Sequence, residues 1–405
     1  MSLVEKLDII ILGGGLIGLS AAYYFSQNFP KLKIGILEKE KSICTHQSKN
    51  NSGVIHSGVY YKPGTLKAQN CIEGKDLLIA FAQENRIPYK VCGKIIVATQ
   101  EEELEILETI YQRGIANGLD KIEKIDLQTI KKIEPYCQGV AAIWVPYTGV
   151  IDYPAVAQKL AEHIQKNSNN KIYLNQIPYK IDYQNNIYLL HTRTKKFECS
   201  YLVSCTGLQS DRVARLCGIK PKVRIVPFRG DYYHLSNGAA QKVNHLIYPV
   251  PNPNFPFLGI HFTRTISGIV ECGPSAVLSF DREGYHKTAF NLYDTLDIFT
   301  YTGALKLFLK YWQIGWLEFK RAFSKKLFLQ SAQKLIPSLQ IKDLEKPRCG
   351  IRAVAVAFNG EIVDDFYFEY GPNAVLVLNA PSPAATACLS IGKYILHQCI
   401  KLFKL

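Results

Sequence analysis

The sequence has no pair of cysteines spaced for a zinc or redox motif. Its 11 cysteines are an odd number, and the closest pair, Cys199 and Cys205, is too far apart for a C-x-x-C site. It also has no low-complexity tract, and its content of 47% hydrophobic and 20% charged residues excludes a largely disordered chain. We therefore expect a folded protein with reduced thiols, long enough at 405 residues to form two lobes.

Segments that could cross a membrane are absent as well. Residues 9–30 carry no charged side chain, but Gly13, Gly14 and Gly15 interrupt this run and Asp8 precedes it. A signal peptide would need a basic start and a small-residue cleavage site, and the sequence has neither. Nothing resembles a mitochondrial presequence. We expect a cytoplasmic protein and leave open a peripheral attachment to the inner face of the cell membrane.

Acidic residues are scarce relative to basic ones. The chain has 48 Lys and Arg against 34 Asp and Glu, a net charge of +14, which suits an anionic substrate, an anionic membrane surface or nucleic acid. No nucleic-acid-binding module is recognisable, so a basic nucleic-acid-binding protein is the least favoured of these classes. We expect no nucleic-acid partner and no metal.

Much of the excess charge falls in residues 301–340, which hold seven Lys or Arg and one acid, Glu318. Hydrophobic residues recur there at spacings of three and four, as on one face of a helix. Such a basic amphipathic helix either lies on an anionic membrane or packs its apolar face on the protein, and the sequence supports both readings equally. The apolar positions are Leu305, Phe308, Trp312, Trp316, Phe319, Phe323 and Leu327.

The chain opens with a strand, a glycine turn, a helix and a second strand. In the turn, Gly13 permits a tight bend, Gly15 lets the backbone approach a pyrophosphate, and Gly18 allows the helix to pack on the strand. Glu38 follows Gly18 by 20 residues, where a carboxylate can accept both ribose hydroxyls of an adenosine. This unit predicts a dinucleotide site. The expected strands are 7–12 and 32–37, and the expected helix is 16–29.

Two later segments favour FAD over NAD. Regular βα units do not follow; instead a loop at 46–61, rich in small polar residues, suits backbone lying along a flavin. A strand at 201–205 then ends in a turn before another helix, and this second strand–turn–helix unit can return to the cofactor. The expected cofactor-binding residues of these segments are Ser48, Asn51, Ser52, Thr206 and Gly207.

The remaining chain alternates between two patterns. Residues 223–278 show period-two alternation, which indicates an antiparallel sheet, whereas 281–335 read as helical. The expected fold class is α/β, with a Rossmann-like FAD-binding lobe interleaved with an α+β substrate lobe on a mostly antiparallel sheet. The FAD-binding lobe is assigned residues 1–88, 148–222 and 347–405, and the substrate lobe residues 89–147 and 223–346.

Six motifs occur in order along nearly the whole chain. They are Asn51 to Tyr61, Pro227 to Gly230, Tyr248 to Pro251, Phe255 to Thr263, Asp281 to Tyr285 and Asn379 to Thr386. Together they resemble the L-2-hydroxyglutarate oxidase/dehydrogenase family, within the D-amino acid oxidase-like flavoproteins. One departure is Val354, where the family usually has Gln, so a polar contact of the family's site is missing. The substrate therefore follows from the resemblance less directly than the fold.

The resemblance implies an FAD-dependent enzyme that oxidises the C2 alcohol of L-2-hydroxyglutarate, a small dicarboxylate, to 2-oxoglutarate. Its electrons would pass to a membrane quinone or to oxygen, and the flavin supplies the redox chemistry. Alternative substrates for the same fold are another 2-hydroxy acid, an amino acid or glycerol 3-phosphate.

Alcohol oxidation at neutral pH needs a nearby base, and histidine is the natural choice. His56 lies in the loop expected beside the flavin, and we favour it as base or substrate ligand. His261, on the expected substrate sheet, is its rival. The alternative readings are a loop histidine bonded to backbone and an ordinary strand residue.

A dicarboxylate calls for arginines, because a guanidinium binds a carboxylate through two parallel hydrogen bonds. Arg229 and Arg352 are the candidates, with structural salt bridges as the alternative for each. Tyr60 and Tyr61 are expected to line the pocket, although tyrosines in such a segment also serve as plain packing.

A proline-containing loop opens the last expected helix. Its backbone N–H groups could point at the flavin's pyrimidine oxygen, whereas the alternative is an ordinary capped helix. The expected cofactor-binding residues here are Asn379, Ser382 and Ala384.

Overall fold

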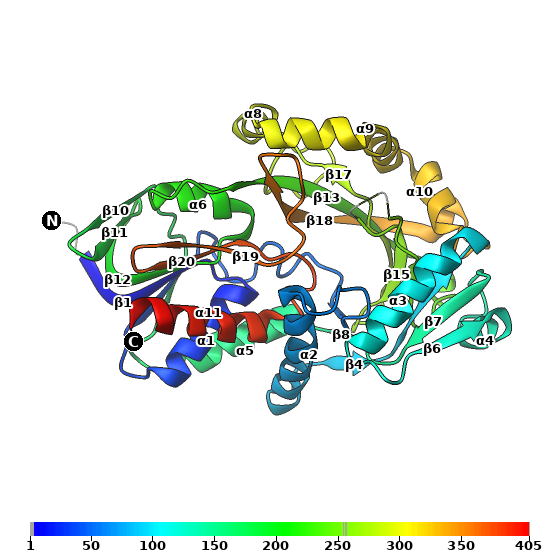
Figure 1. Ribbon diagram of the computed structural model, residues 1–405, viewed down its shortest axis with the longest axis horizontal. Coiled ribbons are helices and arrows are strands. Elements are labelled where there is room, and N and C mark those ends of the chain that lie inside the picture. The colour runs from blue at the N-terminus through cyan, green and yellow to red at the C-terminus, as the bar shows by residue number, and fades with distance from the viewer. Residues whose placement is uncertain (1–3, 254, 256, 405) are drawn as a thin grey trace.

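The structure is a computed structural model that describes residues 4–253, 255 and 257–404, so that Pro256 of the fourth motif lies outside the described part. Two lobes lie side by side along the long axis (Figure 1). One is built on an eight-stranded sheet and the other on a nine-stranded sheet. A third, small sheet has three strands. The predicted α/β class with two interleaved lobes is confirmed. The small sheet comprises β3 (Val54–Ile55), β8 (Gly149–Ile151) and β4 (Tyr89–Val91).

The eight-stranded sheet has a parallel centre. Strand β1 pairs in parallel with β12 and β2, and β12 pairs in parallel with β20. Ile9, Ile10 and Ile11 are fully buried because helices or strands cover both faces, as parallel strands require. The strands are β1 (Val4–Leu12), β2 (Ile34–Leu37), β9 (Lys171–Tyr173), β10 (Lys180–Gln184), β11 (Ile187–His191), β12 (Lys196–Ser204), β19 (Tyr367–Gly371) and β20 (Ala374–Asn379).

Three helices pack under this sheet, and they come from distant parts of the chain. Helix α1 contacts both α5 and the C-terminal α11 (Figure 1). The first and last elements of the chain therefore complete the same lobe. The helices are α1 (Leu16–Asn28), α5 (Tyr153–Gln165) and α11 (Cys388–Phe403); α2 (Leu66–Glu84) packs on α11, and α6 (Ser210–Leu216) lies beside β20.

The nine-stranded sheet is mostly antiparallel, as predicted, with one parallel pair between β14 and β5. Its strands are β5 (Lys94–Ala98), β6 (Glu123–Asp126), β7 (Ala141–Val145), β13 (Val223–Leu235), β14 (Leu246–Pro249), β15 (His261–Arg264), β16 (Val270–Gly273), β17 (Val277–Leu278) and β18 (Leu344–Ala357). Helices α3 (Leu104–Ala116), α4 (Leu127–Ile133) and α7 (Asn237–Ala240) belong to this lobe.

The long strands β13 and β18 form a ribbon that crosses both lobes. They pair along their whole length, from Val223 opposite Ala357 to Leu235 opposite Leu344. One end of β13 joins the core of the first lobe and the other end joins the core of the second. Strand β18 therefore continues past the boundary expected at 346 and 347, because its residues 347–357 have their backbone partner in the second sheet.

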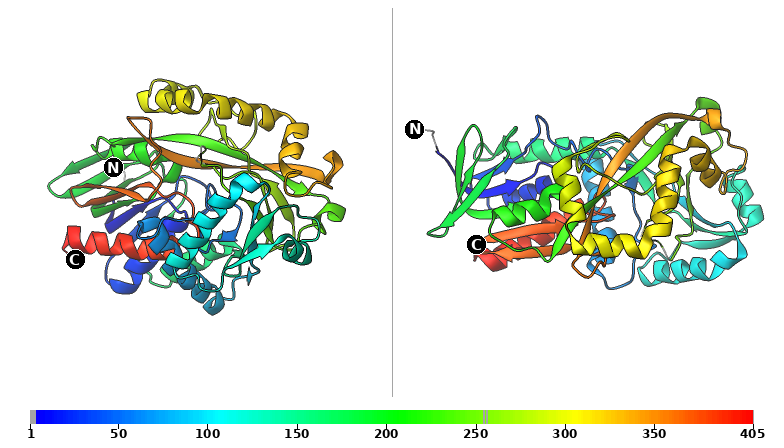
Figure 2. Two further views of the ribbon diagram at one scale, coloured as in Figure 1. Left: turned by 45° about the vertical axis from the view of Figure 1, so that its right-hand side comes forward. Right: turned by 90° about the horizontal axis from the view of Figure 1, so that it is seen from above.

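Helices α8 (Leu292–Phe299), α9 (Thr302–Phe323) and α10 (Lys325–Ala332) form an outer layer on the second lobe. Figure 2 shows them in yellow and orange, and α9 packs on β13, β17 and β18. The helical prediction for 281–335 is wrong at its start, because 281–291 is an irregular segment anchored by side-chain contacts. A break at Tyr311 also bends α9. Within the described residues, no helix is both long and apolar enough to cross a membrane.

The irregular segment contains a fully buried arginine that joins the lobes. The Arg282 guanidinium donates to both carboxylate oxygens of Asp211 on α6, at 2.6 and 3.1 Å, and to Asp297 on α8 at 2.8 Å. It also donates to the carbonyls of Leu208 and Ile225. Burial raises the pKa of the Asp211 carboxyl, but the bonds and charge of Arg282 outweigh it and lower this pKa overall.

Replacing Arg282 by methionine is expected to lower the free energy of unfolding by about 3–5 kcal/mol, because the buried Asp211 would lose its counter-charge. Chemical denaturation followed by circular dichroism measures this. Arg215 contacts the same carboxylate at 3.6 Å from a more exposed position, so Arg215→Met is the matched control, with an expected loss of about 0–1 kcal/mol. Equal losses in the two variants would contradict the role of Arg282.

Candidate active site

A cavity of about 1490 Å³ lies where the two lobes meet. Ligand pockets usually measure about 300–1,000 Å³, so this one is larger than a small acid alone would need. Its walls come from the start of α1, the loop at 47–61, strands β15 and β18, and the loop at 379–385. The cavity therefore joins the expected cofactor segments to the expected substrate sheet.

The glycine turn after β1 is closely packed and leaves one side open to the cavity. Gly13 has a φ of +103°, and a Cβ there would lie 2.5 Å from the Cys205 carbonyl oxygen. A Cβ at Gly18 would lie 2.0 Å from the Gly13 oxygen, so neither position accepts a side chain. Gly15 lines the cavity at the start of α1, where the Leu16 N–H donates to Ser48 Oγ at 3.0 Å. This cradle fits a phosphate group at a helix N-terminus.

Glu38 directly follows β2 and lies beside the glycine turn. Its carboxylate accepts the Gly14 N–H at 2.7 Å and the Glu40 N–H at 2.9 Å, and the side chain is buried. It does not line the cavity, so the structure places it as a support of the turn. A carboxylate has further lone pairs, and the expected contact with ribose hydroxyls stays a prediction.

The polar loop after β2 follows the cavity wall. Ser48, Asn51 and Ser52 line the cavity. The Asn51 side-chain amide donates two hydrogen bonds to backbone carbonyls of the loop and accepts one from a backbone N–H. Gly207 also lines the cavity. Thr206 does not, and its hydroxyl lies 3.3 Å from Ser204 Oγ.

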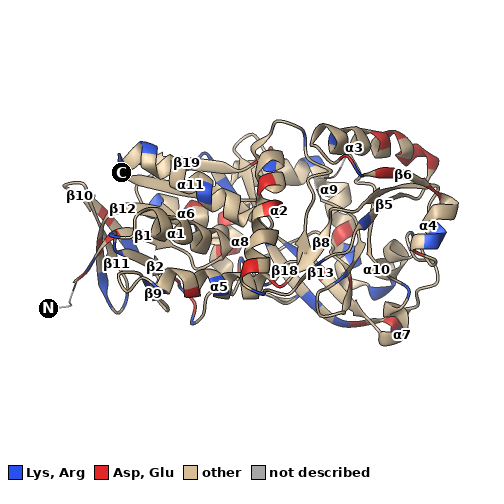
Figure 3. Cartoon of the chain, turned by 90° about the horizontal axis from the view of Figure 1, so that it is seen from below, with Lys and Arg blue, Asp and Glu red and all other residues tan. Residues whose placement is uncertain are grey.

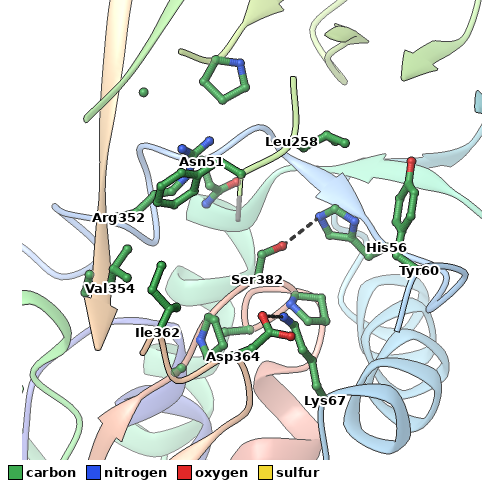
Figure 4. Close-up of a pocket in the computed structure, with 18 of the residues that line it drawn as sticks. Asn51, His56, Tyr60, Lys67, Leu258, Arg352, Val354, Ile362, Asp364 and Ser382 are labelled. Carbon is green, nitrogen blue, oxygen red and sulfur yellow. Dashed lines mark hydrogen bonds and ion pairs between the residues drawn. The ribbon is translucent and has the colours of Figure 1, made fainter. Parts of the chain in front are cut away.

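The loop between β20 and α11 closes the opposite wall. Asn379, Ser382 and Ala384 all line the cavity. The Asn379 amide donates to the carbonyls of Val363 and Asp365, which fixes the start of the loop. Ser382 Oγ lies 3.5 Å from His56 Nε2, as Figure 4 shows. The loop therefore brings its backbone to the side of the cavity that holds the histidine.

Both candidate histidines line the cavity and are neutral at physiological pH. Burial and the positive charge of Lys94 lower the pKa of His56 to about 3. Its Nδ1 is buried without a hydrogen-bond partner among the described residues. Burial likewise lowers the pKa of His261 to about 3, and its Nδ1 lies 2.9 Å from the Gly259 carbonyl oxygen. Because a carbonyl only accepts, that nitrogen carries the hydrogen and Nε2 is left to accept one.

The structure separates the two candidate arginines. Arg352 lines the cavity and forms no ion pair within the described part of the chain; its guanidinium lies 5.2 Å from the ring centre of Phe257. Arg229 does not line the cavity. It is buried, donates to Asp231 at 2.8 Å and also to two backbone carbonyls, so the structural salt bridge expected as its alternative is what the geometry shows.

Strand geometry explains this separation. Phe228 pairs with Arg352 across β13 and β18, so Arg229 stands one position further along β13. Side chains alternate between the two faces of a strand, and the two arginines therefore point to opposite faces.

The two tyrosines of the loop line the cavity as expected. The Tyr60 hydroxyl is buried without a partner among the described residues, and burial raises its pKa well above the usual range. Burial raises the pKa of Tyr61 in the same way. Both phenols are uncharged, and Tyr60 offers a free donor to a ligand.

Two lysines near the cavity were not anticipated. Lys67 lines it and pairs with Asp364 at 2.7 Å. Lys94 is 1% exposed, and its ammonium lies 4.5 Å from the Tyr60 ring centre and 5.0 Å from that of Tyr248. The sequence contains one clue to a buried lysine: Lys94 directly precedes the apolar run Ile95 to Ala98. All four residues of that run are fully buried in the structure.

Comparisons with known proteins agree with this geometry. The sequence pattern described as FAD dependent oxidoreductase matches residues 8–398. The L-2-hydroxyglutarate dehydrogenase of Indibacter alkaliphilus is 46% identical over 397 residues, which cover 98% of this chain and 99% of that protein. The human mitochondrial L-2-hydroxyglutarate dehydrogenase is 41% identical, covering 99% of this chain and 90% of that protein. That of Escherichia coli K12 is 40% identical, covering 96% and 92%.

Solved structures share the fold. The dithionite-reduced L-alpha-glycerophosphate oxidase of Mycoplasma pneumoniae, with FAD bound, superposes with a TM-score of 0.80 at 26% identity, covering 99% of this chain and 96% of that one. Glycine oxidase of Geobacillus kaustophilus gives 0.75 at 16% identity, covering 98% and 95%. FAD is the cofactor of this fold family, and the cradle at the glycine turn fits its pyrophosphate. The chain therefore belongs to the FAD dependent oxidoreductases and, among them, to the family of L-2-hydroxyglutarate dehydrogenases.

Proposed function

We propose that this protein oxidises L-2-hydroxyglutarate to 2-oxoglutarate. The observation that carries the proposal is one cavity that contains neutral histidines and an arginine without an ion-pair partner among the described residues, next to a glycine turn shaped for a dinucleotide. Relatives at 40–46% identity over nearly the whole chain bear the name of this activity. FAD, when bound, accepts the two electrons released at C2.

The cofactor would be held by residues of three segments. The glycine turn receives the pyrophosphate, with Gly15 open to it and Ser48 fixing the first turn of α1. Glu38 remains the proposed partner of the ribose hydroxyls. The other proposed contacts are Gly13, Gly18, Asn51, Ser52, Thr206, Gly207, Asn379, Ser382 and Ala384.

The substrate would be held by charge and oriented by the histidines. Arg352 binds one carboxylate through its guanidinium fork. His56, neutral and with an unpartnered ring nitrogen, takes the hydroxyl proton as the alcohol is oxidised. His261 Nε2 and the Tyr60 hydroxyl are positioned to bind the remaining polar atoms.

Val354 lines the cavity and is buried against Val226 and Leu307. An apolar residue here offers no hydrogen bond to the substrate. Because a missing hydrogen bond can change which substrate is preferred, the comparison substrates are glycerol 3-phosphate, an amino acid and other 2-hydroxy acids.

In anaerobic stopped-flow experiments, L-2-hydroxyglutarate is expected to bleach the flavin absorbance of the wild-type protein. His56→Ala is expected to keep the flavin but slow bleaching by about 10²- to 10⁴-fold, the usual contribution of a positioned base. His397, exposed on α11, provides the control His397→Ala with an unchanged rate. Bleaching by a comparison substrate alone would contradict the proposed substrate, and an unchanged rate in His56→Ala would move the base to another residue.

Arg352→Lys is expected to raise the Michaelis constant for L-2-hydroxyglutarate about tenfold or more, because a hydrogen bond to a charged group contributes about 1.5–3 kcal/mol and a lysine cannot form the fork. Arg229→Lys is the matched control. It is expected to lower the melting temperature, through its bond to Asp231, without changing this constant. Steady-state assays of both variants decide the assignment, and the reverse pattern would contradict it.

We also propose that helix α9 docks the protein on an anionic membrane, where a quinone accepts the electrons, with the rest of the protein in the cytoplasm. The helix buries Ala304, Leu307 and Ala322 on its inner side. Its outer side exposes the apolar residues Leu309, Trp312, Trp316, Leu317 and Phe323, each more than half exposed. Figure 1 shows α8 and α9 at the outer edge of the lobe.

Charge supports a lipid surface as the partner of α9. Lys306, Lys310, Lys320 and Arg321 lie on this helix, and Lys320 stacks over the Trp316 ring at 5.3 Å. Acidic residues of the same lobe gather instead along α3, as Figure 3 shows. Each lysine near anionic lipid contributes about 1 kcal/mol, enough together for reversible binding.

The wild-type protein is therefore expected to sediment with anionic liposomes at low salt and to be released at high salt. Trp316→Glu is expected to reduce sedimentation and quinone reduction while turnover with a soluble dye is retained. Tyr179, 60% exposed on the other lobe, provides the control Tyr179→Glu. A wild-type protein that ignores liposomes at every salt concentration would leave oxygen as the acceptor.

A further inference from the structure

Lys94 is a buried lysine with no ion-pair partner among the described residues. It heads β5, whose other four residues are fully buried, and it is itself 1% exposed. No carboxylate in the described part of the chain forms an ion pair with it. Two tyrosine rings face the ammonium, Tyr60 at 4.5 Å and Tyr248 at 5.0 Å from their centres. Aromatic faces stabilise a cation, but they carry no net charge to neutralise it.

The ammonium lies directly behind the wall of the active cavity. Tyr60 and Tyr248 both line the cavity, and the Tyr248 ring stacks on His261 with centres 4.0 Å apart. His56 is close enough for the charge of Lys94 to lower its pKa. Figure 4 shows His56 and Tyr60 together at one side of the drawn side chains, with Arg352 at the other.

The histidine, tyrosine and cysteine side chains around Lys94 are uncharged near neutral pH. The pKa values of His56 and His261 lie at about 3, so both are neutral above that range. Burial raises the pKa of the Tyr60 and Tyr248 phenols, and it raises the pKa of the Cys71 thiol on α2 to about 12. The charge of Lys94 is therefore not compensated by its neighbours.

Leaving a buried charge unpaired is costly, and proteins normally pair it or shift its protonation. Here burial lowers the pKa of Lys94 to about 7, so the group is poised between its charged and neutral forms. An anion in the cavity would restore the charged form. The substrate proposed above carries two carboxylates, and Arg352 accounts for one of them.

We propose that Lys94 is the buried counter-charge for the second carboxylate of the substrate, acting through the tyrosine layer that separates it from the cavity. Lys94 is in this sense a positioning and specificity residue, because it favours dianionic ligands over monoanionic ones. The inference rests on the proposed function. It adds that binding of a dicarboxylate takes up a proton when the pH lies above the pKa of Lys94.

The direction of the pH dependence follows from this linkage. Below pH 7 Lys94 is already charged, and the dicarboxylate binds without taking up a proton. As the pH rises through 7, the free protein loses this proton, and binding must recover it from solution. Affinity therefore falls as the pH rises, whereas Arg352 stays charged throughout and contributes no such change.

The test is titration of the purified holoenzyme with glutarate, a dicarboxylate without the reactive hydroxyl, followed by the flavin spectrum between pH 6 and 9. The wild-type dissociation constant is expected to be about fivefold or more higher at pH 9 than at pH 6. Lys94→Met, of similar length and without charge, is expected to bind weakly at both values with less than about a twofold change. A wild-type slope that persists in Lys94→Met would overturn the inference.

Lys75 provides the matched control. It is also a largely buried lysine over a tyrosine ring, 5.1 Å from that of Tyr147, but it pairs with Asp76 and does not line the cavity. Lys75→Met is therefore expected to keep the wild-type slope. Loss of the slope in this control as well would also overturn the assignment to Lys94.

A second measurement needs no variant. Calorimetric titration of wild-type holoenzyme with glutarate at pH 8, in two buffers of different ionisation enthalpy, is expected to show uptake of about one proton per ligand. No proton uptake, or no glutarate binding at any pH, would overturn the inference. Bleaching by saturating L-2-hydroxyglutarate decides the proposed function separately, since saturation removes the effect of affinity on whether the flavin is reduced.

Discussion

The buried bonds of Arg282 hold the two lobes in one arrangement. The guanidinium comes from an irregular segment of the second lobe and binds Asp211 on α6 of the first. The same group binds Asp297, which fixes α8 and the start of the outer helical layer. The cavity walls belong to both lobes, and this contact acts together with the β13–β18 ribbon, which carries Arg352, to hold those walls in place. The chemistry of the site is therefore set partly by a residue that does not touch it.

Local signals were enough to predict the nucleotide-binding unit. The positions of Gly13, Gly15 and Gly18 follow from steric limits on a few neighbouring residues, and the structure shows the close contacts that those limits imply. The alternation in 223–278 likewise indicated the antiparallel sheet. The sequence does not reveal the irregular segment at 281–291, because its conformation depends on Arg282 and its distant partners, which leave no periodic pattern.

Which side chains face the cavity is harder to predict from the sequence. Arg229 and Arg352 look equivalent as sequence, and only the register of β13 against β18 decides which of them faces the cavity. A one-residue shift would pair Arg229 with Arg352 and place both side chains on the same face. Lys94 stands at the head of the apolar run Ile95 to Ala98, and its burial depends on Tyr60 and Tyr248, which come from segments far apart in the chain. Such properties arise from tertiary packing and have no local signature.

The order of the chain through the lobes has a consequence for protein synthesis. Strand β1 and helix α1 precede most of the chain, but the sheet and helical layer that they join are completed by β20 and α11, which come much later in the sequence. The sheet of the second lobe likewise lacks a strand until β18 has been made. A domain whose chain is continuous can fold as it leaves the ribosome. Neither lobe here is continuous, so neither can complete its sheet before β18 and β20 have been made.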